Sequence, residues 1–600
     1  MAIINSYQGI LVGGKSSYDA SGTSVSKVGD FNGDGYGDIA IGSPDASPRD
    51  RTNAGVVTII YGNYGNTIPS VINLANNKYP YSQIFGANSG DKCGILVSDA
   101  GDVNNDMYND MIISCYYSSP NQLTDSGAVY VIYGRKNIFN IDLANLANHD
   151  GFAIYGANSQ DNFGFSISKA GDVNSDGFDD IVVGSPIASP NAKTNSGIAY
   201  VIFGKNNSQT IDLSLALDQK KVLQIFGASA GDYLGYSVSG RNLKLGHGSD
   251  LIISANSASD NSRINSGTTY IIFGDVKEGV MDLNKFNLSM GIKIYGANTG
   301  DFSGSSAFSD ESINIDGKLS LAIAAPFASP YSRFQAGEIY ILNSLNFTSN
   351  IDLANFNTKL GSKIIGASSN DKTGSIIKDA GDTNNDGYSD VIIGLPQAPY
   401  LSRKQGGKSF VVYGSSKNKI VDLKTLDSAQ GLIIVGANSL DYSGTSVNSA
   451  GDFNGDGYAD IAIGSPGASP NSKTRSGSVS ILYGGYNVPS SQPSSRPTSQ
   501  PILNPTSVPT SQPNSDPTSM PTSSPTTMPT EAEIEKSKPS SQSTAIALIS
   551  AGGVFFASWL FQGVLYDAFK KYILDPYSEY FWNHGGKYVW EHGVEVFIWL

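Results

Sequence analysis

One short acidic segment of the chain carries the residues best suited to chemistry. It reads DFNGDGYAD at 452–460, with oxygen-bearing side chains at positions 1, 3, 5 and 9 of a tight turn. These oxygens and the backbone carbonyl at position 7 can converge on one point, and the glycine at position 6 permits the sharp bend. An all-oxygen shell of six or seven flexible ligands predicts a Ca²⁺ site.

The same loop occurs five times, each copy with three Asp, one Asn and an aromatic residue at position 7. The predicted ligands are Asp30, Asn32, Asp34, Tyr36 and Asp38; Asp102, Asn104, Asp106, Tyr108 and Asp110; Asp172, Asn174, Asp176, Phe178 and Asp180; Asp382, Asn384, Asp386, Tyr388 and Asp390; and Asp452, Asn454, Asp456, Tyr458 and Asp460. Asp and Asn also form turns without a metal. Five copies in one register nevertheless favour up to five calcium sites.

The predicted role of the ion is structural. Clustered carboxylates repel one another in an empty loop, and a bound cation converts that repulsion into stabilisation of the surrounding hairpin. The copy at 102–110 has Met107 where the other four have glycine. A non-glycine residue is expected to be strained in this turn, so this site ranks below the others.

The loops also reveal a repeat of about 70 residues. Their first aspartates lie 72, 70, 210 and 70 residues apart, so the long gap contains three periods. Two altered copies fill it: GRNLKLGHGSDLIISAN at 240–256 has Lys244 and Gly246 at ligand positions, and SINIDGKLSLAIAAP at 312–326 has serines at the outer ones. The chain therefore carries seven repeats.

Each repeat contains four short apolar runs. In one repeat they lie at 166–172, 180–186, 197–204 and 222–228, with a linker containing IDL before the last run. Their β-branched and aromatic residues, bounded by Gly, Asn, Ser and Pro, predict four β-strands. Repeated four-stranded units build either a propeller or a solenoid.

The two ends of the repeat array favour the propeller. The last repeat stops after its third strand at 478–484, whereas an extra strand, YQGILVGG, begins the chain at 7–14. That first strand can complete the last blade, which closes the ring and removes exposed strand edges. We therefore predict an all-β, seven-bladed β-propeller with four-stranded blades over residues 1–486.

The repeats resemble a known family. VGANSLDYSGTSVNSAGDFNGDGYADIAIGSPGASP at 435–470 and the segment at 155–190 look like FG-GAP repeats, which form the N-terminal propeller of integrin alpha subunits. The resemblance covers about 7–486. It implies Ca²⁺ on one face of the ring, and ligands and a beta subunit on the other. No inserted ligand-binding domain or leg domain is visible, and DAFKKY (567–572) stands where that family has GFFKR.

Composition restricts the remaining alternatives. A net charge of −14 argues against a nucleic-acid partner and favours cations. The two cysteines, Cys93 and Cys115, lie in one repeat, and either a disulfide bridge or two buried thiols fits that placement. The four histidines form no metal cluster before the C-terminal tail.

The composition changes abruptly after the repeats. Residues 487–544 are dense in Pro, Ser and Thr, which predicts a disordered, extended stalk suited to O-glycosylation. The apolar run at 545–566 predicts one transmembrane helix. Lys570 and Lys571 follow it, which places the short aromatic tail at 567–600 in the cytosol and the propeller outside the cell or in a lumen.

These features favour a binding protein over an enzyme. Related repeats occur in a phospholipase that cleaves lipid anchors, but its zinc-dependent catalytic domain has no counterpart in this chain. The leading hypothesis is a cell-surface adhesion or recognition protein with a protein or glycan ligand opposite the calcium loops, near the turns at 86–91 and 189–197. Alternatives are a luminal scaffold or accessory subunit, a polysaccharide- or wall-binding module and, ranked last, an accessory to a phospholipase-like enzyme. A beta-integrin-like partner rests only on the resemblance.

Overall fold

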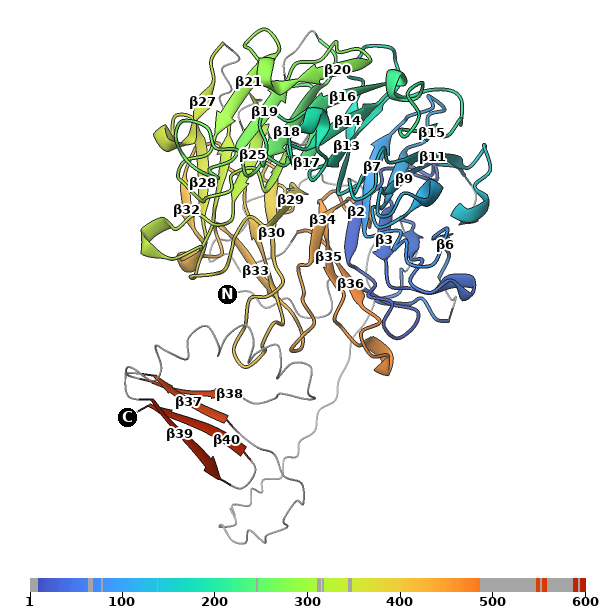
Figure 1. The fold of residues 1–600 in the computed structure, drawn as a ribbon. Helices are drawn as coiled ribbons and strands as arrows, with labels where there is room; N and C mark the ends of the chain where they lie inside the picture. Colours follow the sequence, from blue (N-terminus) through green and yellow to red (C-terminus); the bar gives the residue numbers. More distant parts are fainter. Residues whose placement is uncertain are drawn as a thin grey trace, which may run out of the picture. The chain divides into compact units, whose positions relative to one another are not determined.

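The fold is a ring of β-sheets. The computed structural model describes residues 9–485, apart from gaps at 63–67, 77–78, 137–138, 244–246, 310–313, 316–317 and 344–347, and four strands beyond residue 545. The chain divides into two compact units, Met1–Ser495 and Arg496–Leu600. In the first unit, seven sheets surround a central axis as the blades of a β-propeller (Figure 1), as predicted.

Each blade is a sheet whose first strand lines the axis and whose last strand lies outermost. Blade 1 contains β2 (Ser24–Lys27), β3 (Ile39–Ser43), β4 (Val56–Ile60), β6 (Tyr81–Phe85) and β10 (Asn140–Asp142). Blade 2 contains β7 (Leu96–Gly101), β8 (Asp110–Cys115), β9 (Ala128–Ile132), β11 (Gly151–Tyr155) and β15 (Ile211–Asp212). Blade 3 contains β12 (Ser166–Gly171), β13 (Asp180–Ser185), β14 (Ile198–Ile202), β16 (Val222–Phe226) and β20 (Gly279–Asp282). Blade 4 contains β17 (Leu234–Arg241), β18 (Asp250–Ala255), β19 (Thr268–Ile272), β21 (Gly291–Tyr295) and β27 (Ile351–Asp352).

Three blades complete the ring. Blade 5 contains β22 (Ser306–Phe308), β25 (Leu321–Ala325), β26 (Glu338–Leu342), β28 (Gly361–Ile365) and β32 (Ile420–Asp422), and β23 (Asn314–Ile315) pairs with β24 (Lys318–Leu319) beside it. Blade 6 contains β29 (Ile376–Gly381), β30 (Asp390–Leu395), β31 (Lys408–Val412) and β33 (Gly431–Val435). Blade 7 contains β34 (Ser446–Gly451), β35 (Asp460–Ser465), β36 (Ser478–Leu482), β1 (Gly9–Gly13) and β5 (Val71–Asn73).

Short 3-10 turns occupy two recurrent loop positions. Between the second and third strands of a blade lie η1 (Pro48–Asp50), η2 (Pro120–Gln122), η4 (Pro190–Ala192), η7 (Pro330–Ser332) and η10 (Pro470–Ser472). Between the third and fourth strands lie η3 (Leu143–Asn145), η5 (Gln219–Lys221), η6 (Leu283–Lys285), η8 (Leu353–Asn355) and η9 (Leu423–Thr425).

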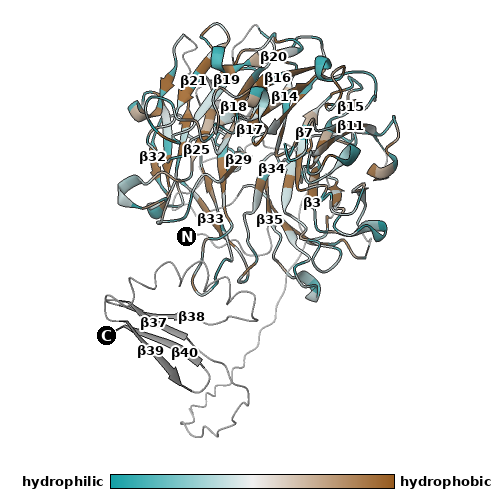
Figure 2. Ribbon diagram, in the orientation of Figure 1, coloured by the Kyte–Doolittle hydropathy of each residue, from teal (hydrophilic) through white to brown (hydrophobic). Residues whose placement is uncertain are grey.

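The core lies between neighbouring blades. Middle strands such as β3 and β13 are buried on both faces, because a blade covers each side of them. Their sequences are accordingly almost continuous apolar runs instead of alternating ones. Ile59 of β4 and Ile113 of β8, for example, share one apolar cluster across the boundary between blades 1 and 2. Figure 2 shows hydrophobic residues concentrated on the strands and hydrophilic residues on the loops.

The ring closes as predicted. β1 pairs antiparallel with β36, from Gly9 opposite Leu482 to Gly13 opposite Ser478, so the two ends of the repeat array share blade 7. Neighbouring inner strands contact one another around the axis, including β2 with β34 at the closure. There the Val25 N–H donates to the Ser446 hydroxyl at 2.8 Å. Residues more than 400 positions apart in sequence are thereby joined.

The prediction of four strands per blade is wrong for six blades, which have five. The additional strand comes from the IDL segment of the following repeat and runs parallel to the fourth strand. In blade 5, for example, Lys363 of β28 lies opposite Ile420 of β32. Sequence analysis predicted a linker here because only two to four residues of the segment pair, too few for a visible period-2 pattern. Pairing with it covers the outer edge of the neighbouring sheet.

A disulfide joins Cys93 and Cys115, which decides between the two alternatives left open by the sequence. Both cysteines are buried, one directly before β7 and the other at the end of β8. The equivalent residues of blade 1 are Ser21 and Ser43. The bridge therefore ties together two positions that are already neighbours in the fold.

The second unit differs from its prediction. Within the apolar run at 545–566, β37 (Ile546–Ser550) and β38 (Gly553–Ala557) form an antiparallel pair where a single helix was expected. β39 (Gly586–Glu591) and β40 (Val594–Trp599) form another. Periodicity does not separate a strand from a helix in a continuous apolar run, and Gly552 and Gly553 interrupt this one. No helix in the described part of the chain is long and apolar enough to cross a bilayer. The predicted stalk at 487–544 lies outside the described residues.

The disulfide should stabilise the propeller mainly by restricting the unfolded chain. Its loop spans 22 residues, so the double replacement Cys93→Ser/Cys115→Ser should lower the free energy of unfolding by about 3 kcal/mol. Urea unfolding with and without dithiothreitol measures this. The reductant should destabilise the native protein and leave the double variant, which resembles blade 1, unchanged. Equal effects of reductant on both proteins would contradict a stabilising bridge.

Candidate functional site

All five predicted calcium loops lie on one rim of the propeller. Each loop joins the inner strand of a blade to the second strand, as between β34 and β35. Because successive strands are antiparallel, the loops that follow the second strand lie on the opposite rim, together with the crossings to the next blade. Hydrogen bonds join these two kinds of loop there, for example Gly90 N–H to Thr52 O at 2.9 Å. We call the two surfaces the loop rim and the opposite rim.

Hydrogen bonds within the loop hold its side chains in a defined arrangement. In the loop at 452–460, the Asp452 carboxylate accepts the N–H groups of Asp456 and Gly457, both at 2.9 Å. Asn454 accepts from Asp456 N–H at 2.9 Å and donates its amide to the Asp456 carboxylate at 2.8 Å. Tyr458 N–H donates to the other Asp456 oxygen at 3.0 Å. The turn is thus built by the predicted ligands themselves.

The other four loops contain the same five hydrogen bonds, between 2.8 and 3.1 Å. Each carboxylate oxygen has two lone pairs, so one hydrogen bond leaves it able to bind a cation. The donor set is all oxygen and fits a hard cation such as Ca²⁺. Among the described residues, no three His, Cys, Asp or Glu side chains are gathered closely enough to hold a metal ion.

The aspartate at position 9 has a second role that sequence analysis missed. Asp460 is fully buried, and its carboxylate accepts the N–H groups of Phe453 at 2.9 Å and Gly484 at 2.8 Å. It therefore ties the start of the loop to the end of the third strand. The signal in the sequence was a glycine 24 residues after this aspartate, because the same bond joins Asp38 to Gly62.

Burial of this carboxylate has an electrostatic cost. Desolvation raises the pKa of Asp460 to about 7, although Gly484 N–H opposes the shift, and the nearby Asp456 carboxylate adds to it. The same cause raises the pKa of Asp180 and Asp390 to about 7, and that of Asp38 and Asp110 to about 8. Each loop thus places a buried acid beside an exposed one at position 5 and a third at position 1, which is half-buried in four of the five loops. A cation would stabilise this combination.

The two altered repeats distinguish the anchoring role of position 9 from its predicted role as a ligand. In blade 4, Asp250 accepts Leu243 N–H at 2.9 Å and Gly274 N–H at 3.0 Å, although Lys244 stands at a predicted ligand position of that loop. In blade 5 the equivalent residue is Ser320, whose hydroxyl donates to Asn343 at 2.8 Å. The anchoring bond therefore forms in a loop that lacks the other ligands.

Met107 has the backbone conformation that its position suggested. Its φ is 72°, and the equivalent glycines have positive φ values from 87° to 92°. The left-handed region disfavours a residue with a Cβ atom, whereas glycine enters it freely. Met107 is 92% exposed, so no packing offsets this strain. The loop nevertheless keeps the hydrogen bonds of the other four.

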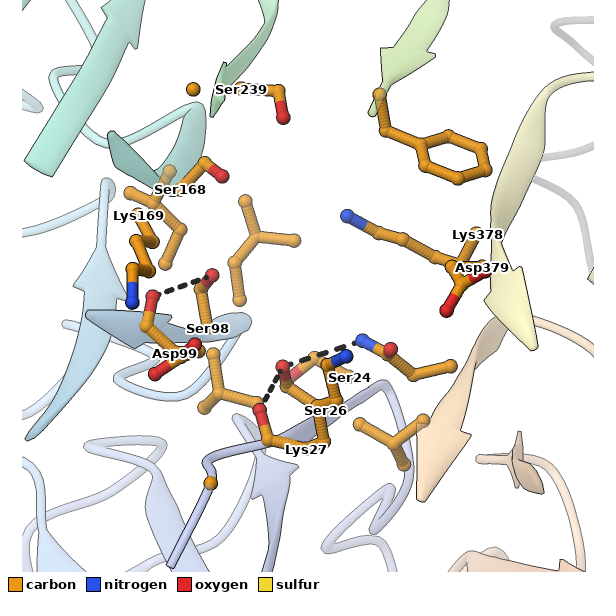
Figure 3. A pocket seen from close by; sticks show the side chains of 18 of the residues that line it. Ser24, Ser26, Lys27, Ser98, Asp99, Ser168, Lys169, Ser239, Lys378 and Asp379 are labelled. Atoms are coloured by element: carbon orange, nitrogen blue, oxygen red, sulfur yellow. Dashed lines mark hydrogen bonds between the residues drawn. The ribbon is translucent and has the colours of Figure 1, made fainter. Parts of the chain in front are cut away.

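A polar channel with a volume of about 770 Å³ lies along the propeller axis among the described residues. The inner strands line it, and their side chains face one another across the opening (Figure 3). Lys27, Lys169, Arg241 and Lys378 bring positive charge to the lining, and Asp99, Asp179 and Asp379 bring negative charge. Sequence analysis missed the channel, although the recurrent Ser-x-Ser-Lys before two of the loops, at 24–27 and 166–169, was its signal.

Charge pairs and hydroxyl groups dominate the channel. Lys169 Nζ lies 3.0 Å from the Asp179 carboxylate. Burial alone would lower the pKa of Lys169, but Asp99 and Asp179 raise it, so this lysine remains charged. Ser26 accepts the Asn448 amide at 3.3 Å. No histidine or cysteine occurs among the described lining residues. The channel thus offers polar contacts, and its lining does not place a nucleophile beside a histidine base.

The two described histidines lie at the surface beside aspartates. His149 lies 3.4 Å from Asp150, and His247 Nδ1 lies 2.9 Å from Asp275. Ser175 also donates to Asp275, at 2.9 Å. Serine and histidine thus contact the same carboxylate, which is not the order of a catalytic triad, where histidine lies between serine and acid. His584 and His592 lie outside the described residues.

Comparison with known proteins agrees with this geometry. The family model for the FG-GAP repeat matches residues 21–60, 163–202 and 443–482, each of which contains one of the five acidic loops. The chain is 30% identical over 214 residues to bovine phosphatidylinositol-glycan-specific phospholipase D, covering 36% of this chain and 24% of the phospholipase.

Integrin alpha chains are also similar. Integrin alpha pat-2 of Caenorhabditis briggsae is 30% identical over 185 residues, which cover 30% of this chain and 14% of the integrin. Integrin alpha-PS5 of Drosophila melanogaster is 27% identical over 237 residues, 39% of this chain and 21% of the integrin. The chain thus spans about a quarter or less of the length of the relatives it matches. It contains FG-GAP repeats, and these build a β-propeller resembling that of integrin alpha chains.

Proposed function

We propose that this protein is a calcium-stabilised recognition propeller that binds a protein or glycan and catalyses no reaction. One observation carries the proposal: five loops on one rim repeat the same ligand set with the same hydrogen bonds. A turn alone requires neither three acids per loop nor their recurrence in five blades. The ions would be held by the five sets of residues predicted from the sequence, from Asp30–Asp38 to Asp452–Asp460.

Calcium would act on this chain as a structural ion. Each loop holds two more accessible carboxylates beside a buried one whose pKa is raised by desolvation, as for Asp38 and Asp460. A divalent cation neutralises this charge and links the loop to the strand that the buried acid anchors. The loop residues themselves orient the oxygens and keep the hairpins in register.

Recognition is assigned to the opposite rim. Several large apolar side chains are exposed on its loops: Tyr18, Ile264, Tyr331, Phe334, Leu401 and Leu440. Exposed apolar groups of this size in neighbouring loops are typical of interaction surfaces, and aromatic residues often dominate binding energy there. They lie in blades 4 to 6 and at the crossings to blades 7 and 1. This agrees with a ligand opposite the calcium loops.

An oxidising location supports the same function. The Cys93–Cys115 disulfide is typical of secreted, cell-surface or luminal proteins. We propose that the propeller lies outside the cell or in a lumen, and that the apolar region at 545–566 attaches it to a membrane. Carbonate extraction of cell membranes tests the attachment, because a peripheral protein is released into the soluble fraction and an inserted one is not.

Calcium should raise the stability of the full chain. At a concentration 100-fold above the dissociation constant, each occupied site should add about 2.7 kcal/mol. Calorimetry in calcium and in EDTA measures the total, and titration calorimetry measures the number of sites. Asp456→Ala should remove one site, whereas Asp50→Ala, at an exposed acid on the opposite rim, should remove none. Identical melting temperatures in calcium and in EDTA would contradict the proposal.

The anchoring aspartates separate the calcium effect from a general defect. Asp250→Ala should cost about 2 kcal/mol in calcium and EDTA alike, because it leaves buried N–H groups unsatisfied in a loop without the other ligands. Asp460→Ala should cost a similar amount in EDTA and more in calcium. Urea unfolding of both variants in both buffers measures the difference. Equal calcium dependence of the two variants would argue against an ion at 452–460.

The opposite rim should contain the recognition surface. The double variant Tyr331→Ala/Phe334→Ala should weaken ligand binding by the full chain at least tenfold, as expected for aromatic anchors. Met107→Ala, on the loop rim, is the control and should bind normally. A glycan array and a pull-down from cell-surface extracts, each with calcium and with EDTA, identify the class of ligand. If the double variant binds the ligand as tightly as the native protein does, Tyr331 and Phe334 do not belong to the recognition surface.

A further inference from the structure

The outer edge of blade 6 differs from that of every other blade. The fourth strand of the other six blades pairs with a parallel fifth strand from the following repeat. In blade 6 the fourth strand is β33, and the described residues provide no fifth strand beside it. The repeat that would supply it has β36 as its last described strand, and residue 485 is the last residue of the propeller that the structure describes.

The six fifth strands share one sequence pattern: an aliphatic residue, an aspartate or asparagine, and leucine. The triplets are Ile72–Asn73–Leu74, Ile141–Asp142–Leu143, Ile211–Asp212–Leu213, Met281–Asp282–Leu283, Ile351–Asp352–Leu353 and Val421–Asp422–Leu423. All six leucines are buried. The pattern therefore fills an apolar site between two blades and presents one polar side chain outward.

The site between blades 6 and 7 lacks these apolar residues. The apolar cluster there contains Leu432, Ile461 and Ile463, but no aliphatic residue or leucine from a fifth strand. Ile434 of β33 is consequently only half-buried. Its equivalent in blade 5, Ile364, lies opposite Val421 and is 1% exposed. An apolar surface that six blades cover is thus left partly open in the seventh.

A positively charged side chain lies beside the β33 edge, at the position from which other blades bind the aspartate of the triplet. Arg51 pairs with Asp142 at 2.8 Å, and Arg263 pairs with Asp352 at 2.8 Å. In blade 5, Arg333 Nη1 contacts Asp422 at 2.7 Å and donates to Gly366 O at 2.6 Å.

The equivalent residue of blade 6 is Arg403, 70 positions after Arg333. Its Nη1 donates to Gly436 O at 2.8 Å, which is the same carbonyl contact. Among the described residues, however, no carboxylate forms a salt bridge with it. Blade 6 therefore keeps both the edge and the charge of a site whose occupant is not supplied by the described part of the chain.

We propose that the β33 edge and Arg403 bind an extended segment of another polypeptide that contains an aliphatic–Asp–Leu sequence. The segment adds in parallel as the fifth strand of blade 6. By analogy with Lys363 N–H, which donates to Lys419 O at 2.9 Å, the Ile433 N–H donates to its backbone. Its aspartate pairs with Arg403, and its aliphatic residue and leucine cover Ile434. Main-chain pairing gives affinity and the side chains give specificity.

The sequence supplies no further copy of the triplet for this edge. No aliphatic–Asp–Leu triplet occurs before Ile72 or after Leu423. The residues that follow β36, YNVPSSQPSS at 486–495, also contain two prolines, which lack the N–H that a paired strand donates. A second copy of this protein is also a poor source, because its own six triplets are already paired. The proposal goes beyond calcium binding and the opposite rim, and rests on neither.

A peptide taken from the protein itself provides the probe. The sequence NKIVDLKTL (418–426), which is the fifth strand of blade 5, should bind the full chain in fluorescence anisotropy. Replacing its Asp by Asn should weaken binding at least tenfold, and backbone N-methylation at alternate residues should abolish it. Arg403→Glu should weaken binding at least tenfold, whereas Lys404→Glu, at the neighbouring cation, should change it less than twofold.

Two further measurements test whether the variant is misfolded and whether the chain itself already occupies the β33 edge. A peptide with Lys in place of Asp should recover binding to Arg403→Glu, which a misfolded variant cannot do. In the free full chain, the Ile433 amide should exchange hydrogen faster than that of Lys363, and the peptide should slow it. Absence of peptide binding, binding that is indifferent to Arg403→Glu, or an Ile433 amide as protected as that of Lys363 before peptide is added would each overturn the proposal.

Discussion

The pairing of strand edges is the constraint on which this structure depends. Every blade is a small sheet whose outermost strand would expose unpaired N–H and C=O groups. The chain satisfies these groups by exchange between repeats: in six blades the following repeat donates a short parallel strand outward, and β1 joins β36 to close the ring. Because these six blades are completed by a strand from another repeat, no single repeat among them forms a finished unit. The seven repeats therefore fold as one body around a common axis.

Buried aspartates attach the acidic loops of the loop rim to these sheets. Asp460 and its equivalents receive N–H groups from their own loop and from the third strand, so each hairpin is tied to its sheet by a carboxylate held away from water. This anchor costs desolvation, and the exposed acids of the same loop add repulsion. The proposed calcium ions would reduce this repulsion between the carboxylates. In the altered loop of blade 4, Asp250 keeps the anchoring hydrogen bonds although Lys244 stands at a predicted ligand position. The anchoring bonds therefore do not require the full set of predicted ligands.

Much of the architecture was accessible from local patterns. Seven periods, four core strands per period and closure by the first strand followed from residue spacing and from apolar runs such as those at 180–186 and 197–204. The fifth strands were missed because a triplet such as Val421–Asp422–Leu423 has no periodicity of its own and pairs only with a strand from another repeat. The apolar run at 545–566 was assigned to a helix, although parts of it pair as β37 and β38, because continuous apolar character fits either structure.

By itself, the sequence determined which residues form the recurring acidic loops, how often these loops recur and how many blades the ring contains. These properties depend on residue type and spacing, which a linear chain records directly. Only the tertiary structure decided that Asp460 is buried as an anchor, that Cys93 and Cys115 are bonded, and that lysines and aspartates from several blades face one another in the axial channel. It also decided that, within the described residues, β33 and Arg403 lack the strand found beside their equivalents. Each of these depends on contacts between residues distant in sequence, which exist only once the ring has closed.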